Sequence, residues 1–249
     1  MGPTSRTFVG DLCLEDMGIV VERIHDMPPI ARVETTDVAG RDGTVLNGLT
    51  YEPRTITLEC RVFRDRWHEF DRIVDELAGH LMTGEEVYLS TRNHPGEHYM
   101  AYLESITEGD REYGGSGIGY LELSFVASDP WRTGVSREVT VPSGGSVTFH
   151  VGGTKPASVL LSSDAATRNQ ASLVWGVRFD ENDFLHVATG SGSSVSVSID
   201  SRTRRVSVSG ATSMVTLDSD WPELAPGTHV ARMDEGTGAA TLAWTERSA

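Results

Sequence analysis

The feature that most constrains the fold of this chain is a succession of short runs in which apolar and polar residues alternate. In the segment 54–63, RTITLECRVF, the apolar residues occupy every second position, namely Ile56, Leu58, Cys60 and Val62. Because successive side chains of a strand point to opposite faces of a sheet, this run predicts a half-buried β-strand. Comparable runs bounded by turn residues recur along the chain and predict a mainly β protein.

The first half of the chain combines predicted strands with one predicted helix. Strands are expected at 17–25, 30–38, 54–63, 85–90, 98–109 and 119–128. Between the third and fourth of these, apolar residues recur three or four positions apart, at Trp67, Phe70, Ile73, Val74, Leu77 and Leu81. This spacing predicts an amphipathic helix with Asp65 as N-cap and Gly84 just past its end. Its apolar stripe is expected to cover a face or end of a sheet.

The second half is rich in Ser, Thr, Gly and Val. Its short alternating runs are interrupted every ~8 to 12 residues by turn residues, which is typical of a β-sandwich. A hairpin is expected around Asp200 and Ser201. Pro130 ends the preceding strand because it lacks the N–H that a sheet requires. We therefore expect two domains, residues 1–131 and 132–249.

The charge of the chain excludes some functions. The formal net charge is -15, and residues 1–131 hold 24 acidic against 11 basic residues. Neutralising nucleic-acid phosphates requires a surplus of Lys and Arg, so the charge argues against non-specific nucleic-acid binding. We predict no sequence-specific nucleic-acid binding either. The same charge repels anionic membranes, and no run approaches the ~18 apolar residues of a membrane span. We therefore also predict no membrane insertion.

Familiar catalytic and metal-binding motifs are absent from the sequence. The segment GGSGIG at 114–119 lacks the final glycine of a G-x-S-x-G nucleophile elbow, and HPGEH at 94–98 has helix-breaking residues between its histidines. The acidic segment DENDF at 180–184 lacks an EF-hand pattern. Cys13 and Cys60 are expected to be free thiols. No carboxylate pair is singled out for glycoside hydrolysis. We predict no enzymatic activity, no metal site and no cofactor.

Three tryptophans of the second half are candidates for sugar contact, because exposed aromatic rings on a β-sandwich stack against sugars. The apolar surroundings of Trp175 and Trp244 favour core packing. Trp221, beside Pro222, is the better candidate for a surface aromatic. An alternative function is therefore that of a carbohydrate-binding module.

The segment VAGRDG at 38–43 is predicted to turn the chain, because Asp-Gly favours turns that need a positive φ. Its central residues are Gly40, Arg41, Asp42 and Gly43. Arg41 has two possible roles, to cap the loop or to reach a neighbouring subunit.

The order of these features in residues 8–131 resembles the distal tail protein (Dit) family of long-tailed, non-contractile bacteriophages. In that family a GRDG turn precedes a tyrosine and a strand of R-x-I-x-L type, matched here by Tyr51, Arg54, Ile56 and Leu58. A strand ending in Asp-Pro-aromatic closes the domain, matched by Asp129, Pro130 and Trp131. The segment 219–233 is similar to the family's closing L-x-P-G-x-N segment, with His229 in place of asparagine.

The resemblance implies a ring-forming, β-sandwich or barrel-like domain with one α-helix, followed by a galectin-like or jelly-roll β-sandwich. It implies a homo-hexameric ring, made in the host cytoplasm, at the distal end of the phage tail in the virion. The ring would join the tail-tube and tape-measure proteins to the tail-associated, lysin-type hub protein and to receptor-binding or tail-fibre proteins. DNA would pass through its lumen, and host glycans are possible further ligands. An acidic ring lets DNA slide instead of gripping it.

Overall fold

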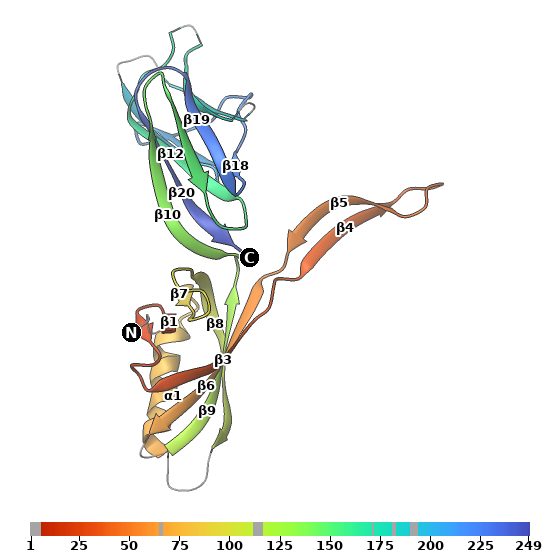
Figure 1. Cartoon of the computed structure of the whole chain (residues 1–249), viewed down its shortest axis with the longest axis vertical. Helices are drawn as coiled ribbons and strands as arrows, with labels where there is room; N and C mark the ends of the chain where they lie inside the picture. The colour runs from red at the N-terminus through yellow and green to blue at the C-terminus, as the bar shows by residue number, and fades with distance from the viewer. Residues whose placement is uncertain (1–5, 65–66, 112–116, 171, 181–182, 190–193) are drawn as a thin grey trace. The chain divides into compact units, whose positions relative to one another are not determined.

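The computed structural model describes residues 6–249 except 65–66, 112–116, 171, 181–182 and 190–193. The chain divides into two compact units, Met1–Thr133 together with Ala249, and Gly134–Ser248 (Figure 1). Strands predominate in both units, so the mainly β fold is confirmed. Within the described residues no helix is long and apolar enough to cross a membrane.

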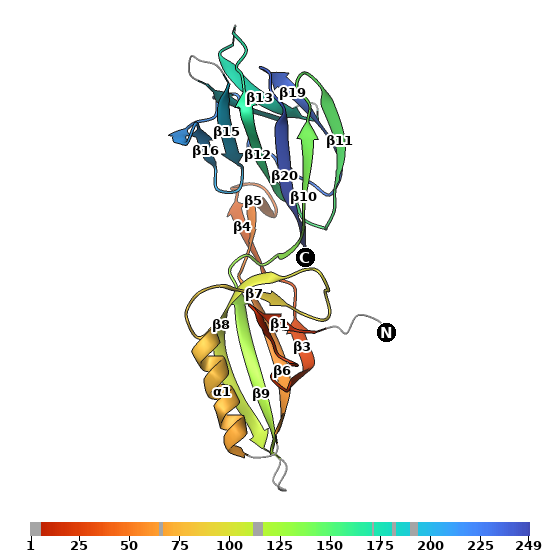
Figure 2. The same cartoon turned by 90° about the vertical axis from the view of Figure 1, so that its left-hand side faces the viewer.

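Unit 1 is built on one antiparallel, seven-stranded sheet in the order β2-β1-β7-β8-β9-β6-β3. Its strands are β1 (Phe8–Val9), β2 (Leu12–Cys13), β3 (Ile19–Asp26), β6 (Arg54–Arg64), β7 (Val87–Ser90), β8 (Tyr99–Arg111) and β9 (Gly117–Ala127). The helix α1 (Trp67–Leu81) lies against one face of this sheet (Figure 2). The strand predicted at 54–63 is confirmed, and its predicted apolar face is the buried one.

The core of unit 1 lies between α1 and the sheet. Phe70, Ile73, Leu77 and Leu81 of α1 are buried there, as predicted. The ring of Phe70 lies so close to β9 that a side chain at Gly119 would collide with it. Burying each large apolar side chain contributes about 1.5 to 3 kcal/mol. Asp65 and the side chain of Trp67 lie outside the described residues, and Gly84 has a φ of 77° beyond the end of the helix.

Two further strands of unit 1, β4 (Ala31–Asp37) and β5 (Thr44–Tyr51), pair only with each other. We call this two-stranded ribbon, residues 31–51, the arm (Figure 1). The sequence predicted β4 but not β5. In β5 the apolar residues Leu46 and Leu49 are three positions apart and Gly48 separates them, so the alternation typical of a strand is lost.

Unit 2 is the expected β-sandwich. One sheet has the order β10-β20-β12-β15-β16-β17, with β18 paired to β12, and the other has the order β11-β19-β13-β14. The strands are β10 (Arg132–Val141), β11 (Ser146–Val151), β12 (Ala157–Ala166), β13 (Val174–Phe179), β14 (Asp183–Ala188), β15 (Val195–Asp200), β16 (Arg205–Val208), β17 (Ala211–Ser213), β18 (Glu223–Leu224), β19 (Gly227–Glu235) and β20 (Ala240–Ser248).

The core of unit 2 is apolar and contains two of the three tryptophans considered above. Trp175 and Trp244 are buried in it, as predicted. The predicted hairpin is formed by β15 and β16, and the Asp200 carboxylate accepts hydrogen bonds from the backbone N–H groups of Arg202 and Thr203. Cys13 and Cys60 of unit 1 are free thiols.

Candidate assembly surface: the arm and its root

The arm exposes apolar side chains that no core covers. Every residue of β4 is exposed, and Val33, Leu46 and Leu49 have 57%, 61% and 49% of their surface accessible. Opposed residues of an antiparallel pair point to the same side. Val33 is opposite Leu49, and Thr35 is opposite Leu46. The three apolar residues therefore share one face of the arm.

A β-bulge produces this alignment. Residues three apart in a regular strand point to opposite sides, so Leu46 and Leu49 would normally be on different faces. The register shifts between Glu34 and Thr35, which leaves Asn47 as the extra residue on β5. The Asn47 side-chain amide donates to the Thr36 hydroxyl at 2.5 Å. The bulge thus turns Leu46 onto the face that carries Leu49.

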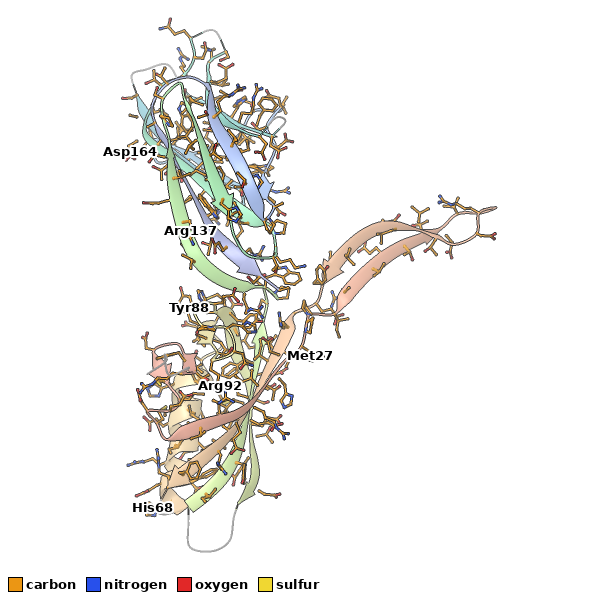
Figure 3. All side chains as sticks on the ribbon, in the orientation of Figure 1. Met27, His68, Tyr88, Arg92, Arg137 and Asp164 are labelled. Atoms are coloured by element: carbon orange, nitrogen blue, oxygen red, sulfur yellow. The ribbon has the colours of Figure 1, made fainter. Side chains whose placement is uncertain are left out.

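The apolar face continues towards the sheet through Tyr51. Tyr51 is opposite Ala31, next in line after the Val33–Leu49 pair. Its ring packs edge-on against Trp131, with 4.8 Å between ring centroids. Met27, also exposed, lies where β3 leads into the arm (Figure 3). The apolar face therefore extends from Leu46 to Trp131.

The residues of the predicted turn lie at the tip of the arm. Gly40 and Gly43 have φ values of 78° and 81°, which favour glycine. The Arg41 N–H donates to the Val38 carbonyl at 3.2 Å. Arg41 and Asp42 are exposed.

The arm leaves and re-enters the sheet at a cluster of polar and charged side chains, most of them buried, which we call the root: Asp26, Arg54, Glu97, Tyr99 and Arg132. Asp26 ends β3, and Arg54 begins β6. The Asp26 carboxylate and the Arg54 Nε are 2.7 Å apart, and their side chains are only 7% and 3% exposed. The Tyr99 hydroxyl donates to the same carboxylate at 3.1 Å.

Two arginines bind further parts of the chain to the root. Arg132 donates to Glu97 at 2.7 Å, to the Tyr99 hydroxyl at 3.1 Å and to the backbone carbonyl of Ala249. Arg54 donates to the Pro130 carbonyl at 3.3 Å. The two motifs of the resemblance, one around Arg54 and the other around Pro130, therefore meet in space.

Two groups of the root, Tyr99 and Arg132, have shifted pKa values. Burial, reinforced by Asp26, raises the pKa of the Tyr99 hydroxyl above its ordinary value, although the neighbouring guanidinium groups oppose this. Burial lowers the pKa of Arg132, but its hydrogen bonds to Glu97 and Tyr99 more than compensate and raise it overall. Tyr99 therefore remains a hydrogen-bond donor between an anion and two cations.

The sheet also carries a groove of about 430 Å³, lined by residues that include Glu22, Glu59, Tyr120 and Glu122. Its charged residues include opposed pairs, since Glu22 lies 2.9 Å from Arg61 and Glu59 lies 3.8 Å from Arg23. Among the described residues, no group of three or more metal-ligating side chains is close enough to hold an ion.

Trp221 and His229 are residues of unit 2 outside the core that were singled out from the sequence. Trp221 is half-buried and packs against the core. The His229 ring lies between the Asp180 carboxylate and the Ala225 carbonyl, at 2.8 and 2.7 Å. Burial lowers the pKa of His229, but these hydrogen bonds raise it overall. His229 thus holds the start of β19 to the residue after β13.

Most residues of the root were not predicted from the sequence. Asp26, Glu97, Tyr99 and Arg132 are distant in sequence, and no motif links them. One signal was present at Arg54, which occupies the first inward position of the alternation that continues with Ile56 and Leu58. A charged residue in an apolar pattern indicates a buried partner.

Family models match both units of the chain. Residues 14–127 match the phage tail protein RIFT-related domain, and residues 152–247 match the C-terminal domain of the siphovirus-type tail component. The chain is thus a phage tail protein of the siphovirus type. No curated protein sequence matches it.

Two solved structures of phage proteins have a fold similar to that of this chain. The crystal structure of SPP1 Dit (gp 19.1), described as a paradigm of the hub adsorption apparatus of phages that infect Gram-positive bacteria, aligns with a TM-score of 0.78 and 18% identity over 98% of this chain and 99% of that one. A chain of the phage P2 baseplate in its activated conformation with Ca aligns with a TM-score of 0.51 and 8% identity over 97% of each chain. The chain belongs to the distal tail protein family of siphoviruses.

Proposed function

We propose that six copies of this chain form a ring at the distal end of a phage tail. The ring joins the tail-tube and tape-measure proteins on one side to the tail-associated hub and receptor-binding proteins on the other. DNA passes through its lumen. The role is structural and involves no catalysis.

The observation that carries this proposal is the exposed apolar face of the arm. An isolated two-stranded ribbon is at best marginally stable in water. Val33, Leu46 and Leu49 are already about half buried, so their complete burial by a neighbouring copy would contribute about 1 to 1.5 kcal/mol each, roughly half the value for a fully exposed side chain. A contact between an arm and a different surface of the next copy is head-to-tail, and repeating it closes a ring when the rotation permits.

The face of the sheet that carries the groove is suited to line the channel. Two of its arginines are engaged by carboxylates, in the pairs Arg61–Glu22 and Arg23–Glu59. Glu122 stands directly opposite Glu59 and adds a further negative charge. Such a surface offers few free cations to DNA phosphates, so DNA slides past without being held.

Assembly tests the proposal. Light scattering and electron microscopy of the full chain, alone and with the tail-tube and hub proteins, should show rings of six copies. Val33→Asp with Leu46→Asp should prevent them, because two charges would be buried at the contact. Leu160→Ser, at an exposed leucine of β12 in unit 2, is the matched control and should leave the rings intact. A wild-type chain that stays monomeric with both partners present would contradict the proposal.

A second candidate function is attachment to host-surface glycans. The supporting observation is Trp221, which is half-buried and so leaves part of its ring accessible. A glycan array with the full chain tests this. Binding that is weaker in Trp221→Leu than in Trp221→Phe would support a stacking contact, and absence of binding by the wild type would rule it out.

A further inference from the structure

We propose that the turn at residues 214–220 of unit 2 docks into another protein of the tail, in an apolar socket bordered by Lys and Arg. This inference rests on the proposed function, because it assigns a contact within the same tail tip. We call this segment the 214–220 turn. It links β17 to β18.

The 214–220 turn presents two very exposed apolar side chains. Leu217 and Met214 have relative exposures of 108% and 82%, the two highest among the exposed large hydrophobic residues of the described chain. Isolated apolar residues are common on protein surfaces, but two at one turn form a small patch. Their burial would favour binding.

Backbone contacts hold the 214–220 turn along the outer strand β14. Val215 forms a bridge with Val187. The Thr216 N–H donates to the His186 carbonyl at 3.0 Å, and the Asp220 N–H donates to the Phe184 carbonyl at 2.7 Å. These bonds occupy the edge of β14, which would otherwise be open to pairing. The apolar side chains are therefore exposed on an anchored segment.

Side-chain contacts around Ser219 fix the shape of the turn. The Ser219 hydroxyl lies 2.9 Å from the His186 N–H and 3.0 Å from the Thr216 hydroxyl. The Ser219 N–H donates to the Thr216 carbonyl at 3.1 Å, which closes the turn around Leu217. The buried His186 ring is held in turn by Asp234 at 3.0 Å. An anchored apolar residue loses little conformational entropy on binding.

The charges beside Leu217 define the chemistry of the partner. Asp218 has a side chain that is 74% exposed, and Asp220 is exposed as well. Hydrogen bonds from the Thr216 hydroxyl and from its own backbone N–H lower the pKa of Asp218, with a further contribution from His186, so the carboxylate stays charged. A partner that buries Leu217 therefore needs basic residues around its socket.

The acidic charges and the residue types of the 214–220 turn disfavour lipid, glycan and a second copy of this chain as its binding partner. Carboxylates next to the apolar tip are repelled by anionic lipid. Leucine and methionine lack the aromatic ring that stacks on sugars. Pairing with the same turn of a second copy would place Asp218 and Asp220 against like charges, which opposes that contact. A different, basic-rimmed protein is the occupant that fits.

Photo-crosslinking from inside assembled tails tests the inference. Leu217→benzoylphenylalanine is introduced into the full chain during phage production, and purified tails are irradiated and analysed by mass spectrometry. We expect a cross-link to a different tail protein, in a segment that contains apolar residues and Lys or Arg. The same reporter at the matched control, Leu160→benzoylphenylalanine, should not give that product. Cross-links only between copies, only to lipid or glycan, or none at all would overturn the inference.

A double variant supplies the quantitative measurement. Tails with Met214→Ser and Leu217→Ser should retain this chain but hold the cross-linked protein about tenfold more weakly or worse, because two anchor side chains are lost. Unchanged retention of that protein would overturn the inference and leave the ring untouched. A wild-type chain that is absent from purified tails would overturn the proposed function and this inference together.

Discussion

The arm and its root reverse the usual placement of apolar and charged residues. In the arm, Val33, Leu46 and Leu49 are roughly half exposed or more, whereas in the root the charged side chains of Asp26 and Arg54 are almost completely buried. Folding of a monomer explains neither arrangement by itself, since burial favours apolar groups and penalises charges. We infer that the arm is shaped for contact with a partner and that the root holds the arm in position.

The root is not the simplest route to stability. Apolar residues of similar volume often replace a buried ion pair without loss, and sometimes with a gain. What charged groups add is direction, because each hydrogen bond fixes a distance and an angle. Arg54 joins Asp26 to the Pro130 carbonyl and so fixes both ends of the arm relative to the end of β9. We infer that the root positions the arm.

Removing one charge of the root gives the largest expected effect. Arg54→Met should lower the free energy of unfolding by about 3 to 5 kcal/mol, because it leaves the Asp26 carboxylate buried without its closest cation. Urea unfolding of the full chain measures this. Arg32→Met is the matched control in the arm, where an exposed pair with Glu52 at 2.9 Å contributes about 0 to 1 kcal/mol. If both variants lost a similar amount of unfolding free energy, the charges of the root would be no more important for stability than those of the arm, which would contradict the comparison.

Tyr99→Phe should have an intermediate effect of about 1 to 3 kcal/mol near neutral pH, because Asp26 and Arg132 each lose a hydrogen bond. The effect depends on pH. The folded-state pKa of Tyr99 is raised, so above its ordinary value near 10 the unfolded chain releases the proton first. In the wild type, the Tyr99 hydroxyl makes its full contribution to the free energy of unfolding below about pH 10. This contribution is lost as the pH rises above that value.

The phenylalanine variant has no such proton, so the difference in unfolding free energy between it and the wild type should shrink above pH 10. Urea unfolding at pH 8 and pH 11 measures the difference, and comparison with Tyr99→Phe cancels the contributions of other groups, including Cys60. A constant difference across this range would show that the Tyr99 hydroxyl is not held protonated by the root.

The sequence predicted the elements whose pattern is local. The strict alternation in β6 and the helical spacing from Phe70 to Leu81 each specify a buried face without reference to the rest of the chain. Arg54 belongs to the same alternating face as Ile56, so its burial was implied by position. Its partner Asp26 was not, because nothing in the sequence places the end of β3 beside the start of β6.

The arm was only half predicted for a related reason. A bulge changes the spacing of β5 by one residue, and its apolar residues then no longer alternate in the sequence although they share one face in space. The positive-φ glycines of the turn were identifiable because Asp-Gly carries a local conformational signal. Apolar residues destined for a partner are not distinguishable by pattern from those of a core, so the exposure of the arm required the structure.

The smallest expected effect on the monomer is in the arm itself. Leu46→Ser with Leu49→Ser should change the free energy of unfolding by about 0.5 kcal/mol or less per substitution, because about half or more of each side chain is already exposed to water in the isolated chain. Urea unfolding at a concentration where the chain is monomeric measures this, and light scattering of the same variant with the tail-tube and hub proteins measures assembly. We expect near-normal stability together with loss of rings. A loss of several kcal/mol in the free energy of unfolding of the monomer would mean that the arm packs against its own chain. The arm would then be a stabilising part of the subunit, like the root, and not a surface for a partner.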